Sequence, residues 1–195
     1  MKATVSLSLL LSVALGGCSV KYTQVGLLEE TLYLKRSDPK IEKKILSLYK
    51  VLHSLSSKVD EEEAKVFSRT AVLYSSYLAE EYELVSPPNM HNFLITIGFR
   101  ERGLCYHWTN DLIAYLSKHK LKSFDLYRAV YEQGKLNEHN SIVVTATGQP
   151  FSEGIILDAW RNSSDLYFKK LSEDRDYIWK QNQKYKVIKG ISYIR

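Results

Sequence analysis

The hydrophobic positions of this chain change their period about half-way along the sequence. From residue 37 to about residue 118, apolar side chains recur every three or four positions, the spacing of one face of an α-helix. Beyond about residue 122, β-branched and aromatic residues gather in short runs separated by turn-forming residues, a pattern typical of strands. Helices followed by strands predict an α+β fold rather than alternating βαβ units.

Two helices are predicted before residue 85. The first begins at Asp38, a favourable N-cap residue that Pro39 follows in the first turn. Asp60, with Glu63 three positions later, resembles a capping box and marks the start of the second. The apolar positions are Ile41, Ile45, Leu48, Leu52 and Leu55 in the first helix, and Ala64, Phe67, Ala71, Tyr74, Leu78 and Tyr82 in the second.

The segment His91–Arg102 fits either a buried helix or a strand, because its apolar run is too short for periodicity to decide. Gly103 interrupts the pattern, and the spacing of Leu112, Ile113 and Leu116 then predicts a helix from Cys105 to about Lys118. A turn at Gly148-Gln149-Pro150 separates two later strands. The four predicted strands are Ser123–Tyr131, Asn140–Thr147, Glu153–Trp160 and Tyr185–Tyr193.

The first residues have the pattern of a secretion signal. A single lysine precedes an apolar run, Val5–Leu15, which is too short to span a membrane, a task that needs ~20 apolar residues. The run ends in Leu15-Gly16-Gly17-Cys18, which resembles a bacterial lipobox, and this implies that Cys18 is lipidated. The alternative is an ordinary signal peptide that is cleaved nearby. We expect a signal peptide over 1–17, a tether over 18–36 and one domain over 37–195.

Composition supports a compact domain outside the cytoplasm. Hydrophobic residues make up 45% of the chain, enough for a core, and a mature part of this length suits one domain. The net charge is +5, but the basic residues are scattered, so nothing indicates a nucleic-acid partner. With the lipobox, the expected location is the bacterial cell envelope, lipid-anchored to a membrane and facing the periplasm or the exterior.

Three residues in the second half of the domain suggest nucleophilic chemistry. Once Cys18 is lipidated, Cys105 is the only free thiol, and an unpaired cysteine in an exported protein suggests reactivity. Cys105 opens a helix, where the exposed amides and the helix dipole stabilise a thiolate. His139, at the start of a strand, would act as base and later as acid, and Asp158, near the end of the next strand, would orient the imidazole.

The turn at Gly148 brings the last two of these residues together. His139 lies nine positions before Gly148 and Asp158 ten positions after it. If the flanking strands pair in antiparallel fashion, the two side chains are nearly level across the hairpin, where facing Cβ atoms lie about 4.5–5.5 Å apart. The sequence therefore predicts a contact between His139 and Asp158.

The order and spacing of Cys105, His139 and Asp158 resemble the transglutaminase-like branch of the papain-like cysteine protease superfamily. In that branch the nucleophilic cysteine opens a helix, and histidine and aspartate lie on consecutive strands of the following antiparallel sheet. The resemblance covers about a third of the chain, Arg102 to Arg161. It implies acyl transfer through a thioester, without a metal or cofactor. The backbone amide of Cys105 is the one oxyanion donor that the resemblance locates in this sequence.

Each site residue also has a structural alternative. Cys105 could be a buried thiol, His139 a hydrogen-bonded residue at a strand start, and Asp158 an outward-facing charge. A zinc site made by Cys105, His107 and His139 lacks the usual paired ligand spacing. Trp108 and Trp160 are expected in the core, with the wall of a substrate groove as the alternative, and Arg161 faces either the groove or solvent.

These patterns lead to one functional hypothesis and one rival. We expect an envelope lipoprotein in which N-terminal helices pack on a transglutaminase-like core. As a cysteine peptidase, an amidase or an acyltransferase, it would cleave or transfer acyl groups of extracytoplasmic peptides, proteins or peptidoglycan stem peptides. The rival is a non-catalytic lipoprotein that uses the same fold as a binding or assembly module.

Overall fold

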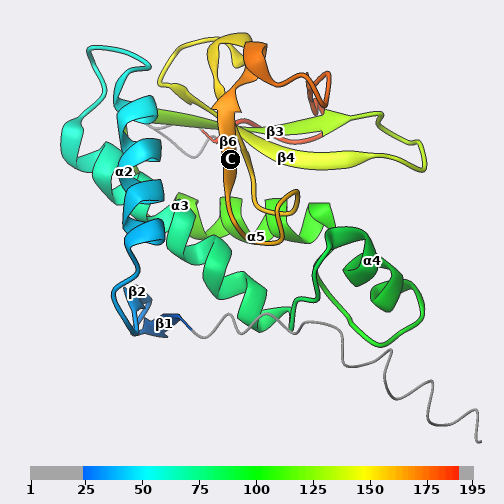
Figure 1. Ribbon diagram of the computed structural model, residues 1–195. Coiled ribbons are helices and arrows are strands. Elements are labelled where there is room, and N and C mark those ends of the chain that lie inside the picture. The colour runs from blue at the N-terminus through cyan, green and yellow to red at the C-terminus, as the bar shows by residue number, and fades with distance from the viewer. Residues whose placement is uncertain (1–23, 189–195) are drawn as a thin grey trace, which may run out of the picture.

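The computed structural model describes residues 24–188 as helices on one face of an antiparallel sheet (Figure 1). The predicted signal peptide 1–17, the lipidation site Cys18 and the end of the last predicted strand lie outside the described residues. The four described helices are α2 (Pro39–His53), α3 (Glu61–Glu81), α4 (Pro88–Thr96) and α5 (Cys105–Lys118). The fold is α+β, as the sequence predicts. Of the ambiguous segment His91–Arg102, only residues 91–96 are helical, as the second part of α4, and the rest is turn and loop.

The start of α2 matches the sequence prediction, and the start of α3 matches it in part. The Asp38 side chain accepts hydrogen bonds from the amides of Lys40 and Ile41, and Pro39 opens α2. The Asp60 carboxylate likewise accepts the amide of Glu63, at 2.9 Å.

The second half of the predicted capping box is wrong. The Glu63 carboxylate accepts the amides of Lys122 and Ser123, at 2.9 and 2.7 Å, instead of returning to the amide of Asp60. The reason is tertiary, because the first turn of α3 lies beside the chain that enters the sheet. The amide of Asp60 donates to the Ser123 hydroxyl.

The main sheet has five antiparallel strands in the order β6-β5-β4-β3-β7. Their bounds are β3 (Phe124–Tyr131), β4 (His139–Ala146), β5 (Ile155–Asp158), β6 (Tyr167–Lys170) and β7 (Lys180–Gln181). The first three lie inside predicted strands or within one residue of them, while β6 and β7 have no sequence prediction. The last predicted strand is wrong where it is described, since of residues 185–188 only Ile188 pairs, in an isolated bridge with Leu126.

Part of the predicted tether is folded. Residues of the segment 18–36 form a hairpin of β1 (Val25–Leu28) and β2 (Thr31–Leu34) that packs against α3. Val25 is completely buried, so hydrophobic burial holds this hairpin on the domain. The prediction that the domain starts at residue 37 places its boundary too late.

The sheet uses its two faces differently. Alternate side chains of β4, such as Ile142 and Val144, point toward the helices and form the main core with α3 and α5, while Val143 points to the opposite face. The largest buried members of the main core include Phe67, Trp108, Leu112, Leu116, Ile155 and Leu157. The opposite face holds a smaller cluster of Tyr127, Ala129, Val143, Ile156 and Trp179.

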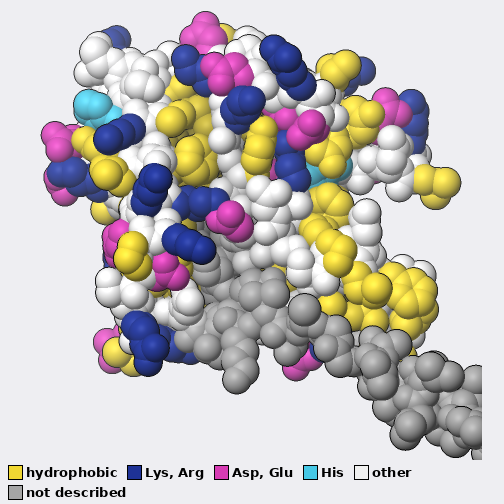
Figure 2. Space-filling view, in the orientation of Figure 1, with side chains coloured by type: hydrophobic (Ala, Val, Ile, Leu, Met, Phe, Trp, Pro, Cys, Tyr) yellow, Lys and Arg dark blue, Asp and Glu magenta, His cyan; other side chains and the backbone are white. Residues whose placement is uncertain are grey.

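On the face shown in Figure 2, basic and acidic side chains are intermingled, and apolar side chains gather mainly over α4 at the lower right. This distribution agrees with the scattered charge of the sequence. Within residues 24–188, none of the helices is long and apolar enough to cross a membrane.

Candidate active site

Cys105 is the first residue of α5, and its free thiol is partly exposed. Gly103, two positions earlier, has a φ of +121°, which residues with a side chain rarely adopt. A Cβ atom at this position would lie 2.2 Å from Nε2 of His91. Glycine is therefore required for the chain to pass His91 and present Cys105 at the helix start.

Three side chains fix the loop that leads into α5. Nδ1 of His107 accepts the amides of Gly103 and Leu104, at 3.1 and 3.2 Å. The indole of Trp108 donates to the Gly103 carbonyl at 2.8 Å, and Nε2 of the buried His91 contacts the Arg102 carbonyl at 2.7 Å. His107 and His91 are thus structural residues, and Trp108 belongs to the core as expected.

The predicted contact between His139 and Asp158 is confirmed. His139 Nε2 lies 2.6 Å from Asp158 Oδ2, and both side chains are almost completely buried. The pairing register of β4 and β5 differs from the one predicted by counting residues on either side of Gly148. Ile142 pairs with Leu157, so Asp158 lies opposite Ser141 and diagonal to His139. The short 3₁₀ turn η1 (Phe151–Glu153) lengthens the connection, and diagonal neighbours on one face remain within reach of long side chains.

Arg161 completes the surroundings of Asp158. Its Nε donates to Asp158 Oδ2 at 3.1 Å, while Asp158 Oδ1 accepts the amides of Trp160 and Arg161. The same guanidinium binds both carboxylate oxygens of Asp174, at 2.7 and 3.1 Å, and Asp174 also accepts the indole of Trp179 at 2.8 Å. Every oxygen of Asp158 is therefore bound, which holds the carboxylate in one orientation.

Aromatic rings enclose the imidazole of His139. The ring centres of Trp160 and Tyr177 lie 4.8 Å from it, and that of Trp179 lies 5.2 Å away. Trp160 therefore belongs to the wall of the site. The sequence did not single out Tyr177, Trp179 or Asp174, because they lie between the predicted strands Glu153–Trp160 and Tyr185–Tyr193, in a segment without recognisable periodicity. The density of aromatic and acidic residues over 174–179 is the one signal that could have drawn attention to them.

The pKa of His139 is raised to about 9. Burial of the ring lowers the pKa, but the hydrogen bond and the charge of Asp158 raise it by more, and Cys105 raises it further. At pH 7 the imidazole is therefore protonated. A protonated imidazole beside a cysteine stabilises the thiolate form of that cysteine.

The thiol and the imidazole are neighbours without a direct hydrogen bond. Nδ1 of His139, the ring nitrogen that Asp158 does not bind, is buried and has no hydrogen-bond partner among the described residues. Cys105 Sγ instead makes a long contact of 3.9 Å with the Glu138 carbonyl. Cys105 nevertheless raises the pKa of His139, so the thiol lies within interaction range of the imidazole.

His139 and Asp158 lie on one face of the sheet, and helix α5, which carries Cys105, packs on the other. His139 and Asp158 occupy the alternate positions of β4 and β5 that also carry Val143 and Ile156, on the face opposite the helices. Helix α5 packs on the other face, and Cys105 lies beside the start of β4, where its Sγ is 3.9 Å from the Glu138 carbonyl. The three residues are therefore gathered at the end of the sheet rather than on one of its faces.

The space beside the thiol is small. The space lined by Cys105, Thr109 and Asn140 has no room even for a group the size of water, whereas most ligand pockets enclose roughly 300–1,000 Å³. A substrate would have to lie across the outside of the site or open it.

Few backbone amides near Cys105 are free to donate a hydrogen bond to an oxyanion. Because His107 occupies the amides of Gly103 and Leu104, these two groups cannot stabilise an oxyanion. The amide of Cys105, at the first position of α5, has no intrahelical acceptor and remains the candidate donor. Among residues 24–188, no group of three or more His, Cys, Asp and Glu side chains is placed to hold a metal ion.

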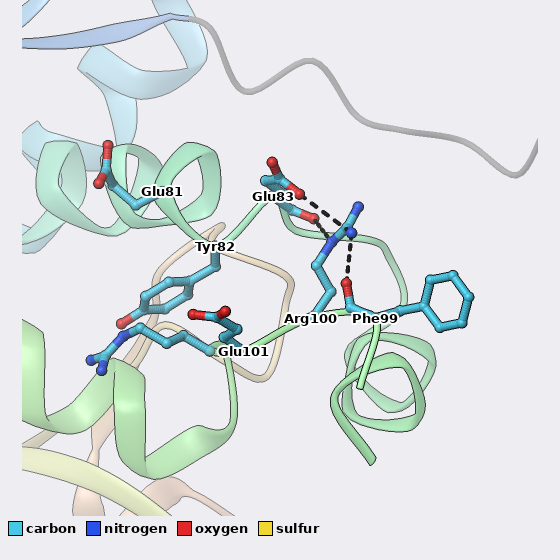
Figure 3. A pocket seen from close by; sticks show the side chains of 7 residues that line it. Glu81, Tyr82, Glu83, Phe99, Arg100 and Glu101 are labelled. Atoms are coloured by element: carbon cyan, nitrogen blue, oxygen red, sulfur yellow. Dashed lines mark hydrogen bonds and ion pairs between the residues drawn. The ribbon is translucent and has the colours of Figure 1, made fainter. Parts of the chain in front are cut away.

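A larger cavity, of about 330 Å³, adjoins the loop before Cys105 (Figure 3). Its described lining, Glu81–Glu83 and Phe99–Arg102, contains none of the three candidate residues. Arg100 contacts the Glu83 carboxylate at 3.3 Å, and Arg102 binds both oxygens of Asp111. These pairs attach the loop to α5 and to the chain just after α3.

No protein-family model, curated protein or solved structure matches the chain. Function is therefore inferred from the geometry of the site and from the resemblance in sequence.

Proposed function

We propose that this protein is an envelope lipoprotein with a transglutaminase-like cysteine site. Cys105 attacks an amide or ester carbonyl, His139 exchanges the proton, and Asp158 holds the imidazole in position. The observation that carries this proposal is the buried contact of 2.6 Å between His139 and Asp158, beside a partly exposed cysteine at a helix start.

The site supports this chemistry in two ways. The protonated His139 favours a thiolate at Cys105, and after attack it can give its proton to the leaving group. The first amide of α5 belongs to the nucleophile itself and is the candidate donor to the negative charge of a tetrahedral intermediate. A thioester on Cys105 would then pass its acyl group to water or to an amine.

The proposed substrates are extracytoplasmic peptides, proteins or peptidoglycan stem peptides, without a cofactor or metal. Because the space beside Cys105 is too small for a compact small molecule, the proposed substrate is an extended chain that lies across the end of the sheet. Lipidation at Cys18 would hold the domain at the membrane of the bacterial envelope.

The test is incubation of the protein with envelope extract, followed by acid quenching and intact-protein mass spectrometry. We expect an acyl adduct on Cys105 in the wild-type protein, and new peptide products that the Cys105→Ala variant does not release. Identical product profiles for the two proteins would contradict catalysis.

A second candidate is a non-catalytic binding or assembly module. The small cavity and the absence of a direct bond between Sγ and His139 Nδ1 favour it. It predicts that the Cys105→Ala protein keeps all partner interactions of the wild type, which co-purification from cross-linked envelopes would measure.

A further inference from the structure

Helix α4 and the turn after it present large apolar side chains to solvent. They are Met90, Phe93, Ile97 and Phe99, with exposed fractions of 47%, 55%, 47% and 70%. The segment from Val85 to Phe99 contains no Asp, Glu, Lys or Arg. An exposed patch of this kind, without a charged residue, marks a surface that contacts an apolar partner.

The opposite side of α4 is firmly attached to the domain. His91 is fully buried, accepts the amide of Val85 on Nδ1 and contacts the Arg102 carbonyl through Nε2. The Asn92 side chain accepts the indole of Trp160 at 3.2 Å. The apolar side chains are therefore carried by a fixed helix, and Figure 3 shows the Phe99 ring pointing away from the neighbouring cavity.

The patch lies on the side of the molecule where the chain enters the domain. Cys18 is six residues before Gln24, so at most ~22 Å of extended chain separates the proposed lipid anchor from the first described residue. Two adjoining cavities, which share Tyr82 and Arg102, run between Leu27 on β1 and Phe99. Both β1 and α4 lie along the lower side of the molecule in Figure 1.

We propose that Met90, Phe93, Ile97 and Phe99 insert into the interfacial layer of the lipid bilayer that holds the N-terminal anchor. A helix with an uncharged apolar face, held near the bilayer by a short linker, is suited to lie in this layer. The proposal depends on the lipidation of Cys18 in the proposed function.

Insertion of α4 into the bilayer interface would also place the active site near the membrane. Asn92 of α4 binds Trp160, whose ring contacts His139, so α4 and the imidazole are joined through one side chain. A membrane-bound α4 would hold Cys105 close to the bilayer surface. The substrate class is then narrowed to acyl donors that are themselves attached to, or lie against, the membrane.

The test uses the full-length lipidated protein in phospholipid vesicles. A photoreactive benzophenone analogue of phenylalanine replaces Phe93 or Phe99, one at a time, and lipid adducts are measured by mass spectrometry after irradiation. Leu46 on α2 and Val66 on α3, with exposed fractions of 50% and 40%, are the control positions on other helices. We expect adduct yields that are several-fold higher at 93 and 99 than at 46 and 66.

The mass of the N-terminal peptide, measured in the same sample, separates the two proposals. Equal lipid adducts at all four positions, or cross-links from 93 and 99 to a second copy of the protein, would overturn the membrane-contact proposal while leaving the anchor and the chemistry intact. An unmodified Cys18 would overturn the anchor and the membrane contact together, and leave the proposed reaction of Cys105 untouched.

Discussion

Arg161 Nε donates a hydrogen bond to the same oxygen of Asp158, Oδ2, that contacts His139. The arginine side chain is 11% exposed and its guanidinium is also bound by Asp174, so the interaction is sheltered from solvent. Arg161 is therefore a positioning residue, which acts on the imidazole through the carboxylate.

Replacement of Arg161 is expected to destabilise the protein strongly. In Arg161→Gln the buried carboxylate of Asp174 loses its positive partner and Asp158 keeps only His139, which costs about 3–5 kcal/mol. Arg69→Gln is the matched control, because its ion pair with Glu42 is half-exposed and contributes at most about 1 kcal/mol. Urea unfolding measures both values. Similar losses in the two variants would contradict the role of Arg161.

The pKa of His139 predicts how stability changes with pH. The folded-state pKa is raised to about 9, above the usual value near 6.5 for an unfolded histidine. The contribution of His139 to stability is therefore fully present below about pH 6.5 and is lost as the pH rises through about 9.

The Asp158→Asn variant isolates this effect. Without the carboxylate charge, burial lowers the pKa of His139, so the loss of stability between pH 6.5 and 9 should disappear. Urea unfolding at several pH values, with NMR titration of the imidazole, measures the difference. Parallel pH curves for the wild type and Asp158→Asn would contradict the assignment.

Gly103→Ala should disturb both the fold and the thiol. The added methyl group would lie 2.2 Å from His91 Nε2, and the positive φ adds backbone strain, so we expect a loss of about 2–5 kcal/mol. Gly98→Ala is the control, because Gly98 also has a positive φ but has open space around it. Thermal unfolding compares the two. An equal, small loss in both would show that the contact with His91 is unimportant.

Glu63→Gln tests the link between α3 and the start of the sheet. The carboxylate accepts two amides, from Lys122 and Ser123, and charge-assisted bonds of this kind contribute about 1.5–3 kcal/mol. Burial raises the pKa of Glu63, but these amides lower it by more, so the bonds weaken as the pH falls through the lowered pKa. Glu62→Gln, on the exposed side of the same turn, should change the free energy of unfolding by less. A larger effect at Glu62 would contradict this account.

Helices α2, α3 and α5, three central strands and the contact of His139 with Asp158 could be predicted because they depend on local pattern, whereas the apolar run of α4 was too short to distinguish helix from strand. Asp38 and Asp60 cap helices through neighbouring amides, and strand alternation places His139 and Asp158 on one face. The exact register could not be predicted, since it depends on the turn η1. The roles of Arg161 and Asp174 also depend on chain segments that meet through tertiary folding, and no sequence spacing encodes them.

The central claim is that His139 activates Cys105, and the pH dependence of Cys105 alkylation tests it most directly. Iodoacetamide labelling is followed by peptide mass spectrometry between pH 5.5 and 9 in the wild type, His139→Ala and Asp158→Asn. The account predicts rapid labelling of the wild type at pH 6–7, where an ordinary thiol is largely protonated, and much slower labelling of both variants in this range. Labelling of Cys105 with the same rate and pH dependence in wild type and His139→Ala would contradict it.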